Sequence, residues 1–230
     1  MPPARISTLA ATATTTPGYA PPAAAHPSET PLPEPTPLEH VDTLLLPVTA
    51  SFNFRYTLWK PSHFATGLEQ RSPDTSWRTF RVGERLTGAV MTMSDQQTLR
   101  AEIYSDTSWA PQDRARLAAR LNHSYGLTED VGQFVDQAAR VPQMREPLTA
   151  LAGMRQSCPE NLFEIAIISL LLQNATVART TQMMTNLLDH YGRRVSFGGV
   201  TLKTFFTPSE ILGIAEAVFR ERDRLGYRAK

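Results

Sequence analysis

The chain has 230 residues and a mass of 25.5 kDa, enough to build a hydrophobic core without disulfides or structural metal ions. Its single cysteine, Cys158, excludes an intramolecular disulfide, and its five histidines are scattered rather than spaced as zinc ligands, so we expect no metal and no cofactor. With 23 basic and 22 acidic residues the net charge is +1, which gives no sign of a nucleic-acid, membrane or acidic-ligand partner.

The first part of the chain is rich in proline. Residues 1–38 contain ten of the 18 prolines and only three charged residues. Such a segment cannot bury enough apolar surface to offset its conformational entropy, so we predict a disordered tail over residues 1–40. Its prolines also break up any signal-peptide or transit-peptide pattern. The longest apolar run, Leu162 to Leu172, contains Glu164 and is shorter than the roughly 20 residues of a membrane span, so we expect no membrane partner.

Alternating apolar and polar residues follow the tail. Residues 50–59 alternate strictly and predict a half-buried strand, and three shorter strands are predicted over Trp77–Val82, Leu86–Met93 and Thr98–Tyr104. The short connections between them favour antiparallel neighbours. We therefore expect an antiparallel β domain over residues 41–108, covered on one face.

Helical periodicity replaces this alternation after residue 109. Pro111 suits the first turn of a helix that Gly126 ends, and Thr128 offers an N-cap for a second helix with an apolar stripe. A third helix is predicted over residues 147–152. These elements predict structure and carry no evidence of function.

The segment from Pro159 to Gly192 is more informative. Almost every residue up to Leu172 is apolar, which predicts a helix that is buried on all sides. It ends in the polar residues Gln173 to Thr176, and a second helix follows directly. The amides at this junction either cap the two helices or present polar groups to a ligand, and the residues alone leave both interpretations open.

The last part of the chain contains another helix start. Thr207-Pro208-Ser209-Glu210 combines an N-cap, a first-turn proline and a capping-box glutamate, and predicts a helix that runs to Phe219. The segment Arg220–Lys230 contains five basic and two acidic residues. This mildly positive end either contacts phosphate or is a solvated face.

Three of these segments together resemble one family. LTALAGMRQSCPENLFEIAIISLLLQNATVARTTQMMTNLLDHYG at residues 148–192, FFTPSEIL at 205–212 and LGYRAK at 225–230 resemble motifs of the helix-hairpin-helix DNA glycosylases, in the branch with the 8-oxoguanine and 3-methyladenine glycosylases. The resemblance implies an α+β fold class: an N-terminal antiparallel β domain followed by an all-α glycosylase domain over residues 109–230.

The resemblance also implies an activity. Such a protein is a base-excision-repair enzyme that flips a damaged purine, oxidised or alkylated, out of double-stranded DNA and hydrolyses its N-glycosidic bond. We expect a monomer, in the bacterial cytoplasm at the nucleoid or, in a eukaryote, in the nucleus. Whether the enzyme is monofunctional or also an AP lyase stays open.

Site residues are carried over from the family's gap-filling loop. Aligning the family's Ile-Ala-Arg with Val177-Ala178-Arg179 places Asn174 and Arg179 on residues that fill the gap and hold the orphaned base. Gln173 is expected to orient this loop and to contact DNA with them. The neighbours Ala175 and Thr176 depart from the family's Asn-rich pattern, which leaves the identity of the opposite base open.

The family's catalytic motif has no counterpart in these 230 residues. The Leu-Pro-Gly-Val/Ile-Gly hairpin, the catalytic aspartate and the lyase lysine follow LGYRAK in the family, so no catalytic residue is assigned within the chain. We expect a domain that is incomplete at its C-terminus and inactive alone. The alternatives are a non-catalytic DNA-binding paralogue and an unrelated α+β binding scaffold.

Overall fold

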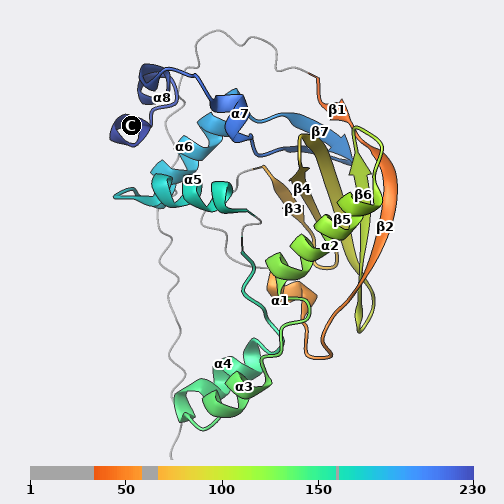
Figure 1. Cartoon of the computed structure of the whole chain (residues 1–230). Helices are drawn as coiled ribbons and strands as arrows, with labels where there is room; N and C mark the ends of the chain where they lie inside the picture. Colours follow the sequence, from red (N-terminus) through yellow and green to blue (C-terminus); the bar gives the residue numbers. More distant parts are fainter. Residues whose placement is uncertain (1–33, 59–66, 159–160) are drawn as a thin grey trace, which may run out of the picture. The chain divides into compact units, whose positions relative to one another are not determined.

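The protein combines a twisted β-sheet with short helices (Figure 1). The structure is a computed structural model that describes residues 34–58, 67–158 and 161–230. Most of the expected tail lies outside these residues. Two strands begin before residue 41, β1 (Thr36–Pro37) and β2 (Glu39–Pro47), so the tail boundary at residue 40 was placed too late.

The larger sheet has five strands in the order β2-β6-β5-β4-β3, and every neighbouring pair is antiparallel. Its other members are β3 (Glu69–Arg71), β4 (Ser76–Val82), β5 (Arg85–Asp95) and β6 (Thr98–Ser105). The last three confirm predicted strands. The edge strand β2 was not predicted, because its sequence lies next to the proline-rich tail.

The predicted strand over residues 50–59 is wrong. Within the described residues this segment forms a short helix, α1 (Phe54–Leu58), with residue 59 outside them. The Asn53 side chain accepts a hydrogen bond from the N–H of Tyr56 at 3.0 Å and so caps the helix. Phe54 and Leu58, four residues apart, both enter the core beside the sheet. A short alternating pattern also places residues i and i+4 on one face, so it cannot distinguish a strand from a single helical turn.

Helix α2 (Pro111–Tyr125) confirms its prediction and covers one face of the sheet (Figure 1). Its Leu117 and Leu121 are fully buried against inward side chains of β5 and β6 such as Met91 and Ile103. Gly126 ends the helix in a left-handed conformation with φ 58°, which glycine adopts without steric cost.

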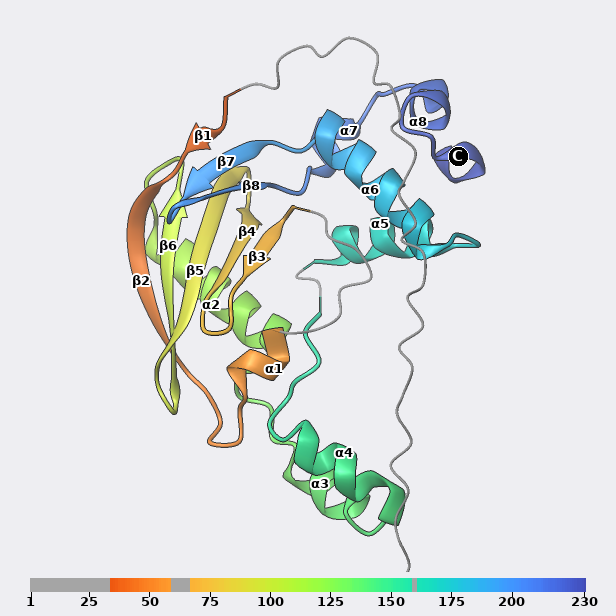
Figure 2. The ribbon, with the colours of Figure 1, turned by 180° about the vertical axis from the view of Figure 1, so that it is seen from behind.

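A β-hairpin that was not predicted covers part of the other face of the sheet (Figure 2). Its strands are β7 (Arg194–Phe197) and β8 (Val200–Lys203), and β1 pairs in parallel with β7. Gly198 and Gly199 both have positive φ and form the two-residue turn. A Cβ atom on Gly88 of β5 would lie 2.7 Å from ring carbons of Phe197, so the glycine permits this close packing.

A short helical pair follows α2. It consists of α3 (Gly132–Ala138), the 3₁₀ turn η1 (Pro142–Met144) and α4 (Arg145–Ala150). Val131 rather than Thr128 occupies the N-cap position of α3, because the Thr128 hydroxyl donates to the Asn122 side chain at 3.0 Å. Phe134, in the predicted apolar stripe, is 60% exposed.

The prediction of a helix buried on all sides is also wrong. Helix α5 (Leu162–Leu172) buries only Glu164 and Leu171, whereas Leu162 is 80% exposed. One stripe packs into a core cluster with α6 (Val177–His190), and no described element covers the opposite stripe. Sequence hydrophobicity predicts what a helix could bury and not what is present to cover it. None of the described helices is both long and apolar enough to cross a membrane.

The helix predicted from Thr207 to Phe219 is divided in two. The capping box is present, but α7 (Pro208–Ile211) ends where Leu212 turns extended and Gly213 takes φ 87°. The chain resumes as α8 (Glu216–Glu221) and the 3₁₀ turn η2 (Gly226–Ala229).

Candidate nucleic-acid interface

The loop between α5 and α6 carries two of the predicted site residues, Gln173 and Asn174. Asn174 has a left-handed backbone with φ 45°, a conformation that Asn tolerates better than most residues. Thr176 is the N-cap of α6, and its hydroxyl accepts a hydrogen bond from the N–H of Arg179 at 3.3 Å. Arg179, the third predicted residue, therefore lies in the first turn of α6, close to the loop.

The structure bears on the two interpretations of the junction amides. The side chains of Gln173 and Asn174 are exposed, and neither makes a hydrogen bond within the described part of the chain. The side-chain cap of α6 comes from Thr176 instead. Both amides are consequently accessible to a ligand rather than used to satisfy helix ends.

The C-terminal turn η2 lies against this loop. The Tyr227 hydroxyl donates to the carbonyl oxygen of Gln173 at 3.2 Å, and the Arg228 guanidinium donates to the same oxygen. The Arg228 guanidinium also lies over the Tyr227 ring, 4.5 Å from its centroid. Arg228 is buried while Tyr227 is 51% exposed, so the aromatic ring is presented to solvent beside Asn174's loop.

A second contact joins the same segments. The Arg179 guanidinium donates to the carbonyl oxygen of Arg224, a residue with φ 58°. The structure thus brings together residues 173–179 and 224–228, which we call the loop edge. It contains all three predicted residues. Sequence reasoning did not single out Tyr227 and Arg228, although LGYRAK, one of the family motifs, contains both.

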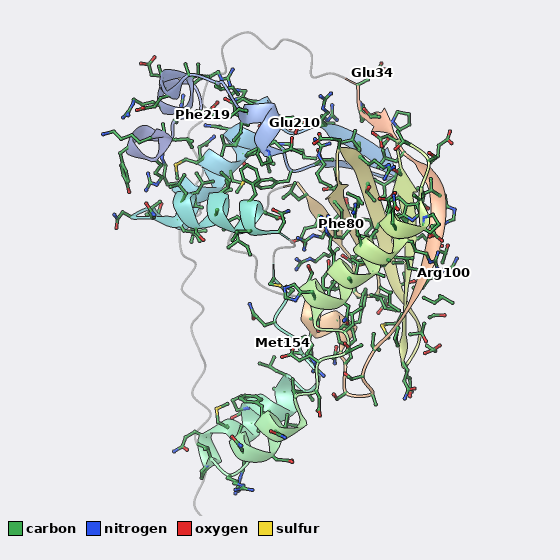
Figure 3. All side chains as sticks on the ribbon, in the orientation of Figure 1. Glu34, Phe80, Arg100, Met154, Glu210 and Phe219 are labelled. Atoms are coloured by element: carbon green, nitrogen blue, oxygen red, sulfur yellow. The ribbon has the colours of Figure 1, made fainter. Side chains whose placement is uncertain are left out.

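A buried carboxylate, that of Asp223, lies directly before the second segment of the loop edge. Asp223 is fully buried, and its Oδ1 lies 2.5 Å from Nδ1 of His190 and 3.1 Å from Nε of Arg222. Its Oδ2 accepts from the Tyr191 hydroxyl at 2.6 Å. Burial, followed by the hydrogen bond to Asp223 and its negative charge, raises the pKa of Tyr191 to about 12. The Tyr191 ring also packs on Phe219 of α8, labelled in Figure 3, at 5.6 Å between centroids.

A pocket of about 190 Å³ lies elsewhere and shares no residue with the loop edge. Its polar lining includes Arg78, Arg81 and Glu164, with Arg78 Nη2 3.9 Å from Glu164 Oε1. Arg81 binds both oxygens of Glu210, labelled in Figure 3, at 2.7 and 2.8 Å. These charges are already paired within the protein. No group of His, Cys, Asp and Glu in the described ranges could hold a metal ion.

Comparison with known proteins gives one match in sequence. A curated protein of Methanothermobacter thermautotrophicus, named "Probable N-glycosylase/DNA lyase", is 26% identical over 171 residues, which are 70% of this chain and 53% of that protein. The chain thus spans about half the length of this relative. No family model matches the sequence.

Solved structures give the same result for the fold. The 3-methyladenine DNA glycosylase from Archaeoglobus fulgidus superposes with a TM-score of 0.64 at 13% identity, over 81% of this chain and 66% of that one. The chain thus has a fold similar to that of a DNA glycosylase. The Clostridium acetobutylicum 8-oxoguanine glycosylase/lyase is also similar, with a TM-score of 0.55 at 14% identity, over 84% of this chain and 62% of that one. The resemblance to the helix-hairpin-helix DNA glycosylases is confirmed, and the mixed α and β fold with it.

Proposed function

We propose that the protein takes part in base-excision repair as a DNA glycosylase that recognises a damaged purine, oxidised or alkylated, in double-stranded DNA, and that it acts as a monomer. The observation that carries this proposal is the convergence of Asn174, Arg179, Tyr227 and Arg228 on the loop edge. The substrate class rests on the two similar glycosylases, whose names refer to 8-oxoguanine and 3-methyladenine, both purines.

The loop edge suits the physical demands of base flipping. Removing a base from the stack costs a few kcal/mol and leaves a gap that small or aromatic side chains can fill. Asn174 is a short polar side chain at the tip of a left-handed turn, and the half-exposed Tyr227 ring offers a stacking surface beside it. We propose that these two side chains fill the gap.

Arg179 provides recognition of the unpaired partner base. A guanidinium has five N–H donors, so the bond of the exposed Arg179 to Arg224 leaves further donors for a base edge or a phosphate. Because a backbone carbonyl oxygen already orients the Arg179 side chain, little rotamer entropy remains to be lost on binding. Arg228 is buried and orients the loop through the Gln173 carbonyl oxygen.

No residue of the chain is proposed to act in catalysis. The buried carboxylate nearest to the loop edge, Asp223, is fully engaged by protein donors and cannot reach a sugar. The family motifs assign no aspartate or lysine of the chain to catalysis. We therefore propose that the 230-residue chain recognises DNA with a missing base but does not cleave the glycosidic bond by itself.

The proposal is tested by the affinity of the chain for fluorescein-labelled duplexes, measured by anisotropy at low salt. One duplex contains a tetrahydrofuran abasic analogue opposite cytosine, and the other is intact. We expect the abasic duplex to bind about tenfold more tightly, because its gap is already open. Asn174→Ala and Arg179→Ala should each lower this preference about five- to tenfold, the value of one or two hydrogen bonds to a charged or desolvated partner.

The matched control is Arg116→Ala, which removes an exposed arginine from α2 on the other part of the molecule. This variant should retain the preference for the abasic duplex. Equal affinity of the wild-type chain for both duplexes would contradict the proposed function. Excision of 8-oxoguanine or 3-methyladenine by the chain alone would contradict its proposed inactivity.

A further inference from the structure

Asp223 is held in place by hydrogen bonds to several side chains. Both of its carboxylate oxygens are bonded to side chains, and its main-chain carbonyl oxygen accepts a hydrogen bond from the Asn186 side chain at 3.1 Å. The donors Asn186, His190 and Tyr191 all belong to the C-terminal part of α6 or the residue after it. One end of α6 thus holds Asp223 from three directions.

The residue that follows Asp223 leads directly into the loop edge. Arg224 has φ 58°, and its carbonyl oxygen accepts the guanidinium of Arg179, at the opposite end of α6. Leu225 is buried, and its N–H donates to the carbonyl oxygen of Phe219 at 3.0 Å. The turn η2 then places Tyr227 and Arg228 on the carbonyl oxygen of Gln173.

Helix α6 therefore contacts the segment 223–228 at both of its ends. Its C-terminal end fixes Asp223, and its N-terminal end, through Arg179 and the preceding loop, contacts Arg224, Tyr227 and Arg228. A segment held at Asp223 cannot slide along α6 without leaving the Arg179 guanidinium or the Gln173 carbonyl oxygen. A left-handed residue other than glycine, such as Arg224, persists only where its surroundings hold it in place.

From this geometry we infer that Asp223, clamped by His190, Tyr191 and Arg222, is a positioning residue that holds the segment 224–228 in place and so sets the DNA-contacting geometry of Arg179 and Tyr227. The inference rests on the proposed function of the loop edge. It assigns to Asp223 no contact with DNA, because the side chain is fully buried. A buried ion pair is weak evidence for stability, whereas its role in specifying one geometry is testable.

The first test is independent of DNA. In the 230-residue chain, Asp223→Asn keeps the shape of the side chain but removes its charge and one acceptor oxygen. We expect amide hydrogen exchange in residues 224–229 to become about tenfold faster, with exchange in α2 unchanged. The control, Asp189→Asn, removes another carboxylate of α6 that pairs with Lys203 instead, and should leave exchange in residues 224–229 unchanged. Unchanged exchange in Asp223→Asn would overturn the inference.

The second test asks whether Asp223 acts through Arg179. The readout is the dissociation constant for the tetrahydrofuran duplex. We expect Asp223→Asn to raise this constant about fivefold, and the double variant with Arg179→Ala to raise it no more than Arg179→Ala alone. Losses that multiply would show that Asp223 affects binding by general destabilisation and would overturn the inference.

Two further outcomes distinguish failure of the inference from a failure to fold and from failure of the proposed function. If Asp223→Asn does not fold, Tyr191→Phe removes only one hydroxyl from the clamp and should still increase exchange in residues 224–229 by about threefold; no increase overturns the inference. If the wild-type chain has no preference for the abasic duplex, the proposed function fails and the functional role of Asp223 fails with it, even where the exchange data support the clamp.

Discussion

At the scale of single residues, the buried Arg155 side chain makes hydrogen bonds to several loops at once. It is only 3% exposed, and its guanidinium donates to Thr49 Oγ1 and Ser51 Oγ at 3.0 Å and to the carbonyl oxygens of Glu129 and Gly153 at 3.1 Å. Its backbone N–H donates to Thr57 Oγ1. One side chain thereby ties together the loop after β2, the loop after α2 and the end of α4.

Replacing Arg155 should therefore destabilise the fold. Arg155→Met keeps the aliphatic part and removes every donor, which leaves several buried acceptors unsatisfied, and we expect a loss of about 2–4 kcal/mol in the free energy of unfolding. Urea denaturation measures it. The exposed Arg145, whose guanidinium has one long hydrogen bond to Ala139, provides the control, with an expected change within about 0.5 kcal/mol for Arg145→Met. Similar stability for the two variants would contradict this role of Arg155.

At the scale of elements, the capping box of α7 joins the helical part to the sheet. Glu210 accepts from the Thr207 N–H at 2.7 Å and binds Arg81 of β4 through both oxygens. Burial alone would raise the pKa of Glu210, but the hydrogen bond from Thr207 and the charge of Arg81 outweigh it and hold this pKa below the ordinary value of 4.5.

The sign of the pH dependence follows from this lowered pKa. Glu210 contributes stability above pH 4.5, and the contribution is lost as the pH falls through the lower folded-state pKa. Glu210→Gln should cost about 1–2 kcal/mol near pH 7, and the difference from the wild type should shrink as the pH falls below 4.5. Urea denaturation across this range measures it. Glu216→Gln, at the more exposed Glu216–Arg220 pair, should show little effect, and a Glu210 difference that does not change with pH would refute this explanation.

Some elements were predictable from the sequence and others were not. Strands β4, β5 and β6 and helix α2 were predicted because alternation, caps and short connections agreed with one another. The β7–β8 hairpin was missed although Gly198-Gly199 is a strong two-residue turn signal. Helix α1 was predicted as a strand because the burial of Phe54 and Leu58 beside the sheet is a tertiary fact, whereas the local N-cap signal of Asn53 was missed.

The candidate site was predictable only in part, for a similar reason. Gln173, Asn174 and Arg179 are close in sequence, and a family motif pointed to them. Tyr227 and Arg228 lie in another segment, some fifty residues away, and only the fold reveals that they meet Gln173. Asp223 gives no sequence signal, because its partners on α6 are defined by a helix–turn contact.

At the scale of the whole molecule, the net charge and the covering of the sheet both point to the loop edge as the proposed DNA-binding surface. The net charge of +1 provides no general attraction to the phosphate backbone, so the proposed DNA binding would depend on local arginines. Helix α2 covers one face of the five-stranded sheet, and the β7–β8 hairpin covers part of the other, where Leu45 and Arg100 are exposed. The loop edge is the part of the described chain where exposed arginines, amides and an aromatic ring converge.

We propose above all that residues 173–179 and 224–228 form one DNA-binding surface. Hydrogen exchange of the 230-residue chain, measured with and without a saturating tetrahydrofuran duplex, is the direct test. We expect both segments to gain protection together, about tenfold or more in exchange rate, while exchange in the sheet strands β4 to β6 does not change. Protection of neither segment, of only one of them, or of the sheet instead would contradict a shared DNA-binding surface.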